Sequence, residues 1–189
     1  MNHTKVDRRI RYTKMMFRDA LVAMLRDKHI SGISVKELCE LADVNRSTFY
    51  AHYRDPLDLL HQIEAEVFEN VKLYLDKQEY IDYPRVSQKV LTDILTYGKE
   101  NASLFEALLS ENSDYAFQRD LLELSQIMSS QYTLGFNQKE SEYLQAFATA
   151  GCVSVLQKWL RNGAAESPET ISALVLCFLR GGMIGFAIN

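Results

Sequence analysis

The sequence predicts an all-α protein, and three of its features support this prediction. Apolar residues recur every three or four positions through most of the 189 residues, which is the spacing of one helix face. Helix breakers are scarce, with 3 prolines and 8 glycines in the whole chain. Helix-start signals stand where the apolar pattern resumes: Ser34 is followed by Glu37, and Asp55 is followed by Pro56.

The first predicted helix covers residues 7–28 and has one apolar face and a basic remainder. Gly32 follows it as a stop or turn residue. The basic side chains at its start are suited to contact phosphate. The apolar face comprises Ile10, Phe17, Leu21, Met24 and Leu25. The basic residues are Arg8, Arg9, Arg11, Lys14, Arg18 and Arg26.

The stretch 34–53 predicts two short helices joined by a tight turn. Ser34 caps the first helix, and Glu37 completes a capping box. Asp43 and Val44 interrupt the apolar pattern, and Asn45 restarts it as a second N-cap. Such a pair of helices is the helix-turn-helix (HTH) unit, whose second helix reads DNA. The apolar side of the first helix is Val35, Leu38, Leu41 and Ala42, and the core of the unit is Leu38, Val44, Phe49 and Tyr53.

A long linking helix follows, with Asp55 as its cap and Pro56 at its first position. It divides the chain into a DNA-binding domain (1–55) and a helical body (56–189), in which residues 56–79 form the link. A loop is expected at 77–84. The apolar stripe of the helix comprises Leu57, Leu60, Ile63, Val67, Val71 and Tyr74, and the residues expected to face elsewhere are Glu64, Glu66 and Glu69.

Five helical patterns make up the body. Three cover 86–99, 102–109 and 114–130, and a break at Gly135 precedes the last two. The last two are 141–160 and the helix opened by Ser167-Pro168. Both are apolar around much of their circumference, so their apolar surface must be buried against another part of the protein. We expect a second subunit, packed about a twofold axis, to bury this surface, and a simple intrachain core is the alternative. The predicted interface residues are Phe147, Gly151, Val155, Trp159, Leu174, Cys177 and Phe178.

Charge is distributed unevenly along the chain. The net charge is −4, yet residues 1–60 carry 11 Lys or Arg against 8 Asp or Glu, and the remainder carries 10 against 17. A basic end on an acidic body is typical of a protein whose N-terminal part binds a polyanion. An ordinary solvated helix face is the alternative explanation.

The HTH residues carry a family resemblance. Ala42-Asp43-Val44 in the turn, followed by 46–53 with its aromatic–His–aromatic ending, resembles the DNA-binding domain of the tetracycline-repressor (TetR/AcrR) family of bacterial transcriptional regulators. The resemblance covers about residues 8–60, and residues 80–189 are similar to the family's ligand-binding and dimerisation part in pattern only. Two departures matter. Asp43 stands where the family usually has Gly, so we expect a left-handed backbone there. Pro56 stands where a phosphate-binding Lys is common, so that contact is lost or moved to Arg54.

The resemblance implies specific roles in DNA binding. Arg46 is a candidate for a guanine contact. A contact with phosphate or solvent is an alternative of the same weight. Tyr50 and His52 resemble the family's phosphate-contacting pair. Ser34 and Lys36 lie at a helix N-terminus, which favours an anion. The predicted DNA-binding residues are Arg8, Arg9, Arg11, Ser34, Lys36, Asn45, Arg46, Ser47, Thr48, Tyr50, His52 and Arg54.

The implied function is that of a ligand-responsive repressor that binds a palindromic double-stranded DNA operator as a homodimer and is released by a small-molecule effector. The alternative is an HTH co-regulator whose body binds a partner protein. The candidate effector-binding residues, each of which is otherwise a plain core residue, are Tyr97, Phe105, Tyr115, Phe117, Tyr132 and Trp159.

Other classes of protein find little support. The sequence has no Gly-rich phosphate loop, no G-x-S-x-G and no metal-spaced His/Cys cluster, so we expect no enzyme, no cofactor and no metal site. The three cysteines, Cys39, Cys152 and Cys177, are expected as reduced thiols. No apolar run is long enough to span a membrane and the first residues are not signal-like, so a cytoplasmic protein with no membrane partner is expected.

Overall fold

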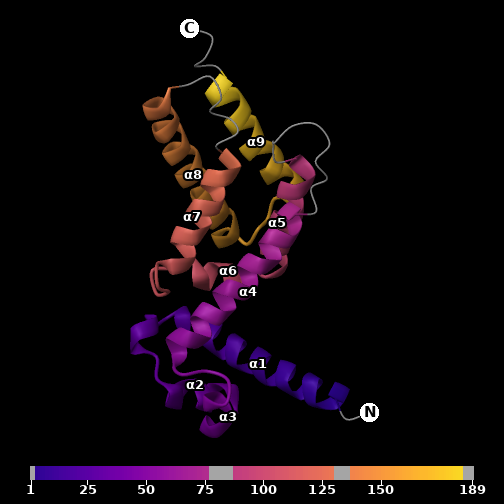
Figure 1. Cartoon of the computed structure of the whole chain (residues 1–189), viewed down its shortest axis with the longest axis vertical. Helices are drawn as coiled ribbons and strands as arrows, with labels where there is room; N and C mark the ends of the chain where they lie inside the picture. The colour runs from indigo at the N-terminus through magenta and orange to yellow at the C-terminus, as the bar shows by residue number, and fades with distance from the viewer. Residues whose placement is uncertain (1–2, 77–86, 130–136, 185–189) are drawn as a thin grey trace. The chain divides into compact units, whose positions relative to one another are not determined.

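The computed structural model describes residues 3–76, 87–129 and 137–184, and the elements in these ranges are all helical (Figure 1). This confirms the predicted all-α fold class. The expected loop at 77–84 and the break at Gly135 lie outside the described residues. The elements are α1 (His3–Leu25), the 3-10 turn η1 (Ile30–Gly32), α2 (Val35–Ala42), α3 (Arg46–Tyr50), α4 (Pro56–Asp76), α5 (Gln88–Glu100), α6 (Ala102–Leu108), α7 (Ala116–Ser129), α8 (Gln138–Arg161) and α9 (Pro168–Ile184).

Two compact units make up the chain. The first unit comprises Met1–Glu69 together with Ala107–Tyr115, and the second comprises Asn70–Glu106 and Ala116–Asn189. Helix α4 therefore begins in one unit and ends in the other. The predicted domain boundary after residue 55 stays a prediction. Among the described residues, no helix is both long and apolar enough to cross a membrane.

An aromatic cluster forms the centre of the first unit. Phe17 of α1 meets Phe49 of α3 edge to face, with ring centroids 5.2 Å apart, and meets Tyr53 in the same way at 6.0 Å. Phe17 and Phe49 are fully buried, and the aliphatic side chains around them share that burial. Edge-to-face pairs add to the free energy of apolar burial, so this cluster holds α3 firmly against α1. The surrounding fully buried residues are Leu21, Leu25, Leu38 and Leu60.

Residues 107–115 join the first unit through Asn112, although they lie far from α1 in the sequence. The backbone N–H of Ile30 donates to the carbonyl of Asn112 at 2.8 Å. The side-chain amide of Asn112 donates to the carbonyl of Leu25 at 3.0 Å. The latter satisfies a carbonyl at the C-terminus of α1, where four carbonyls lack intrahelical partners.

The turn between α2 and α3 has the predicted backbone. Asp43 has φ 51° and ψ 43°, which is the left-handed conformation expected for a residue at a position where glycine is common. Helix α3 begins at Arg46, as predicted, after Asn45 in an extended conformation, but the Asn45 side chain makes no capping hydrogen bond. The recognition helix expected over 46–53 ends at Tyr50. Helical hydrogen bonding continues one turn further, since the Tyr53 N–H donates to the carbonyl of Phe49.

Several predicted faces need correction. In α2, Cys39 is buried and Leu41 is exposed, so the apolar face is shifted by part of a turn. Ile10 of α1 and Leu57 at the second position of α4 are exposed, so the buried stripe of each helix begins later in the sequence than predicted. Val44 is only half-buried. Glu64, expected to face outward, is 5% exposed because Asp114 and its neighbours cover this side of α4.

The second unit is built from the end of α4, from α5, from α6 up to Glu106, and from α7 to α9. Figure 1 shows α5 beside α9 and α7 beside α8, and the contacts agree with this pairing. Ala148 of α8 packs on Leu176 and Leu179 of α9. The hydroxyl groups of Thr92 and Ser172 join α5 to α9 at 2.7 Å.

Candidate nucleic-acid interface

Helix α3 has one exposed, mainly polar side and one buried apolar side. Phe49 is fully buried, whereas Arg46 and Ser47 are exposed and Thr48 is half-buried. Tyr50 is 61% exposed, and its ring meets Phe49 edge to face at 5.6 Å. The aromatic cluster thus fixes the helix while its N-terminal residues, the end that reaches base edges in an HTH, face solvent.

A polar hollow of about 470 Å³ lies at the turn of the HTH unit. Its walls carry both signs of charge, and the basic groups belong to residues predicted to contact DNA. The Lys36 ammonium is 3.9 Å from the Glu40 carboxylate, within the same helix. The lining residues are Lys36, Cys39, Glu40, Asp43, Val44, Asn45 and Arg46.

Ser34 at the start of α2 is engaged within the protein. Its N–H donates to Glu37 at 3.0 Å, its hydroxyl donates to Glu37 at 2.7 Å, and the Glu37 N–H donates to the hydroxyl at 3.3 Å. The predicted capping box is therefore confirmed. Lys28 donates to the other Glu37 oxygen at 2.7 Å. The hydrogen bonds from Lys28 and Ser34 lower the Glu37 pKa to about 2. A phosphate at Ser34 would compete with this carboxylate.

Arg54 lies in the link between α3 and α4 and contacts Asp58. Its N–H donates to Asp58 at 2.9 Å, and its guanidinium donates at 3.2 Å. The backbone hydrogen bond from Arg54 is the main cause that lowers the Asp58 pKa; desolvation opposes it, and the guanidinium bond adds a further lowering. Asp55 accepts from the Asp58 N–H at 2.8 Å, which confirms it as the cap of α4. The Arg54 side chain remains largely exposed. His52 is half-buried beside Tyr53.

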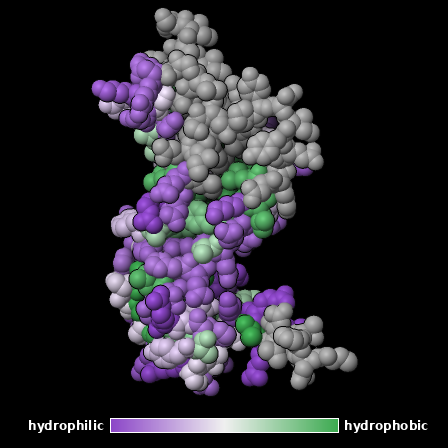
Figure 2. Space-filling view, in the orientation of Figure 1, coloured by the Kyte–Doolittle hydropathy of each residue, from purple (hydrophilic) through white to green (hydrophobic). Residues whose placement is uncertain are grey.

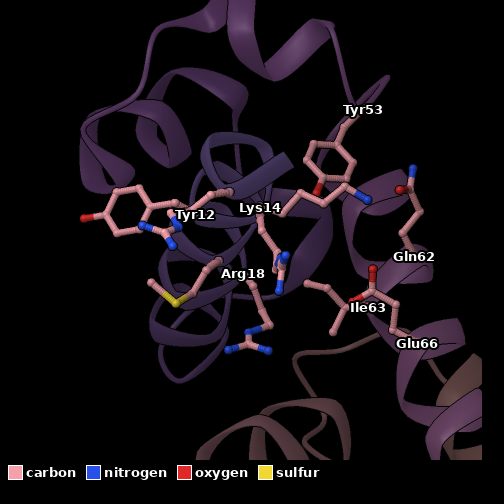
Figure 3. A pocket seen from close by; sticks show the side chains of 10 residues that line it. Tyr12, Lys14, Arg18, Tyr53, Gln62, Ile63 and Glu66 are labelled. Atoms are coloured by element: carbon pink, nitrogen blue, oxygen red, sulfur yellow. The ribbon is translucent and has the colours of Figure 1, made fainter. Parts of the chain in front are cut away.

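Four basic residues of α1 lie on one wall of a second hollow, of about 580 Å³ (Figure 3). Lys14 and Arg18 come from α1, and Gln62, Ile63 and Glu66 come from α4 on the other side. Sequence analysis missed this hollow, although the spacing of Arg11, Lys14 and Arg18 places them on one side of a helix. The remaining lining residues are Arg8, Arg11, Tyr12, Met15 and Tyr53.

Four cationic side chains and one carboxylate, that of Glu66, line this hollow, and this net positive charge favours an anion such as phosphate. Arg8, Arg9 and Arg11 are all exposed on α1. Burial, with smaller contributions from Glu66 and Asp58, raises the pKa of Tyr53 to about 12, so its hydroxyl stays protonated at neutral pH. On the face drawn in Figure 2, the described surface of this unit is mostly hydrophilic, with some hydrophobic areas.

Three of the six predicted effector-binding residues come together in the second unit. The ring of Tyr97 lies 5.7 Å from that of Phe105, which lies 6.0 Å from that of Phe117. Tyr74, at the end of α4, extends this row, with its ring 6.0 Å from Tyr97. Phe105 and Phe117 are buried, so they contribute to the core of this unit.

The other three effector-binding candidates lie elsewhere. Tyr115 is exposed and belongs to the first unit. Tyr132 lies outside the described residues. Trp159 is buried in the second unit, where its indole N–H donates to the carbonyl of Glu166 at 3.1 Å. It packs the corner between α8 and α9, and its burial leaves little surface for a partner chain.

The predicted interface residues on α8 and α9 include an exposed apolar patch. Phe147, Leu174 and Phe178 are 61%, 56% and 51% exposed, and the rings of Phe147 and Phe178 lie 5.5 Å apart. Cys177 is an exposed thiol. Gly151 and Val155 are half-buried. An exposed cluster of large apolar side chains is uncommon on a monomeric protein.

Comparisons with known proteins agree with this architecture. A TetR-type family model, described as "Transcriptional regulator C-terminal region", matches residues 86–181. The uncharacterised HTH-type transcriptional regulator YxbF of Bacillus subtilis is 24% identical over 161 residues, or 84% of this chain. The match covers 42% of YxbF, so the chain spans about two fifths of the length of that curated relative.

Solved structures share the fold. The TetR transcriptional regulator from Streptococcus agalactiae 2603V superposes with a TM-score of 0.65 and 22% identity, over 94% of this chain and 98% of that one. The dihydroxyacetone kinase operon activator DhaS superposes with a TM-score of 0.60 and 18% identity, over 91% and 96% of the two chains. The HTH unit, the all-α body and the match to a transcriptional-regulator family model together indicate a transcriptional regulator. The chain belongs to the TetR family.

Proposed function

We propose that this regulator binds a roughly palindromic DNA operator as a homodimer, with each α3 in a major groove. The observation that carries the proposal is the exposed edge of Arg46, Ser47 and Tyr50 above the buried Phe49. In HTH dimers the two recognition helices lie about 34–36 Å apart when half-sites are one helical turn apart. Operator symmetry then mirrors the symmetry of the protein.

The contacts divide into base readout and phosphate binding. We assign the guanine contact to Arg46, because it is the first residue of α3 and its side chain can donate to a guanine edge. We assign phosphate contacts to Tyr50, to the exposed arginines of α1 and to Lys36 beside the turn, and their exposure supports this assignment. Ser34 and Arg54 are engaged with Glu37 and Asp58, so we assign them to positioning the HTH unit first.

The α8–α9 patch supports the homodimer. Phe147, Leu174 and Phe178 expose large apolar surfaces, and burial of apolar surface stabilises association by roughly 25 cal/mol per Å² before the entropic cost of association. The same patch from a second chain is self-complementary, as a twofold axis requires.

A small effector that enters the second unit would control DNA binding. The aromatic row of Tyr74, Tyr97 and Phe105 would offer an effector apolar rings and two phenol groups, which is the usual character of a small-molecule site. The effector releases the DNA only if it binds the non-binding arrangement more tightly. Repression is the proposed outcome of operator occupancy; the relative DhaS is an activator.

The test is selection of binding sites from a random DNA duplex pool, repeated at two salt concentrations. A palindromic consensus whose affinity falls steeply with salt would support the proposal, because phosphate contacts release counterions. Absence of any enriched sequence would refute it. In that case, a protein that binds the chain stoichiometrically would support the co-regulator alternative.

A further inference from the structure

Three metal-ligating side chains meet in the first unit, away from the proposed DNA-binding face. His61 and Glu64 lie three residues apart on α4, a spacing that places both on one side of the helix. Asp114 lies beyond α6, 53 residues from His61. One ligand atom from each of the three lies within 4.8 Å of the others.

The separation of the His61 and Asp114 ligand atoms is close to the spacing that a small divalent ion needs. Zinc binds imidazole nitrogen and carboxylate oxygen at about 2.0–2.2 Å, so two ligands of a tetrahedral ion lie roughly 3.3 Å apart. The His61 Nε2 atom is now 2.6 Å from Asp114 Oδ2, a hydrogen-bond distance. Replacing the shared hydrogen with an ion requires these two atoms to separate by less than about 1 Å, which small side-chain rotations supply.

The donor set favours a transition metal over magnesium or calcium. One imidazole and two carboxylates match the ligands that zinc uses, whereas hard ions prefer oxygen ligands alone. Three protein ligands leave one tetrahedral position for water. His61 and Asp114 keep 48% and 26% of their side-chain surface exposed, so an ion and its water can reach the site.

The surroundings of Glu64 add a second argument. Glu64 as a whole is 5% exposed, on a helix face that also buries Leu60, Ile63 and Val67. Little water competes for a carboxylate at such a position, so a cation bound there interacts with it more strongly than at the surface.

We propose that His61, Glu64 and Asp114 form a binding site for one divalent transition-metal ion, with Zn²⁺ as the best-matched ion. The bound ion links the first half of α4, directly after the HTH unit, to residues 107–115. Sequence analysis had predicted no metal site, because the third ligand is distant in sequence. The proposal does not depend on DNA binding.

The test uses the full chain, stripped of metal with a chelator that is then removed. Zn²⁺ is titrated by calorimetry, and Co²⁺ is titrated by visible absorption. We expect one ion per chain, a tetrahedral Co²⁺ spectrum without thiolate charge-transfer bands, and a rise in melting temperature with Zn²⁺. His61→Gln and Asp114→Asn should each weaken affinity at least tenfold.

His29→Gln is the matched control. His29 is an exposed histidine of the same unit, its ring is hydrogen-bonded to Ser31, and it is not one of the three proposed ligands. This variant should bind metal as the wild type does. Circular dichroism of the metal-free variants checks that they fold. No saturable binding, equal affinity in the His61→Gln variant, or a thiolate band in the Co²⁺ spectrum would each overturn the proposal.

Discussion

Glu37 accepts hydrogen bonds from Lys28 and from Ser34, and these contacts lower its pKa from 4.5 to about 2. A single carboxylate thereby joins the end of α1 to the start of α2. It also satisfies the Ser34 N–H, one of the donors left without a helical partner at a helix start.

The depressed pKa of Glu37 predicts how stability depends on pH. The folded state holds the charged form more strongly than the unfolded chain, so the stabilisation is present above pH 4.5 and is lost as pH falls towards about 2. Denaturation of the wild type and of Glu37→Gln should therefore differ at pH 7 and converge at pH 2–3. Glu40→Gln, on the exposed side of α2, is the control and should show no such convergence.

Arg46 is expected to read a base. Arg46→Ala should relax discrimination at one base pair per half-site, at a cost of about 1–3 kcal/mol against the preferred base. Competition binding with operators that carry single substitutions measures this. A loss of equal size on every sequence would identify a phosphate contact instead.

Tyr50 is expected to bind phosphate through its exposed hydroxyl. Tyr50→Phe removes the hydroxyl and leaves the ring contact with Phe49, so operator affinity should fall by about 1 kcal/mol on all sequences while the melting temperature stays unchanged. Tyr50→Ala should weaken binding further without unfolding the protein. Unchanged affinity in both variants would contradict the phosphate role.

At the scale of elements, the α2–α3 turn carries backbone strain at Asp43. Its φ of 51° is unfavourable for residues with a Cβ atom, although Asp tolerates it better than most. The neighbouring Val44 N–H donates to the carbonyl of Cys39 at 3.1 Å, so the turn closes α2 tightly. The aromatic cluster around Phe49 holds α3 in place despite this strain.

Relief of that strain should stabilise the unit. Asp43→Gly should raise the free energy of unfolding by about 0.5–1 kcal/mol, because glycine adopts this conformation without a steric cost. Asp43→Val should lower it, because a β-branched side chain tolerates positive φ poorly. Urea denaturation of the three proteins gives the order, and an Asp43→Gly protein less stable than the wild type would contradict the strain argument.

At the scale of the whole molecule, association is expected to depend on the α8–α9 patch. Phe147→Glu combined with Phe178→Glu should place four like charges in a twofold interface and raise the dimer dissociation constant by about 100-fold or more, or about 2.7 kcal/mol. Sedimentation equilibrium measures this, and operator affinity should fall with it. Tyr115→Glu, an exposed aromatic residue outside the patch, is the control. A double variant that remains a dimer would exclude this interface.

Local chemistry explains what could be predicted. The Ser34–Glu37 capping box, the Asp55 cap and the left-handed Asp43 all depend on residues within about four positions of one another, and all appear in the structure. Burial was less predictable. Cys39 and Leu41 lie two positions apart on α2, and only the packing against α1 and α3 decides which of them is covered.

The sequence by itself determined that the chain is helical, where its HTH unit begins and turns, and to which family it is similar, because these depend on spacing and local hydrogen bonds. Tertiary structure decided that residues 107–115 join the first unit, that Glu64 is buried, and that His61 meets Asp114. The physical reason is distance along the chain. His61 and Asp114 are 53 residues apart, and Leu25 and Asn112 are 87 residues apart. The local sequence around one partner contains no information about the position of the other.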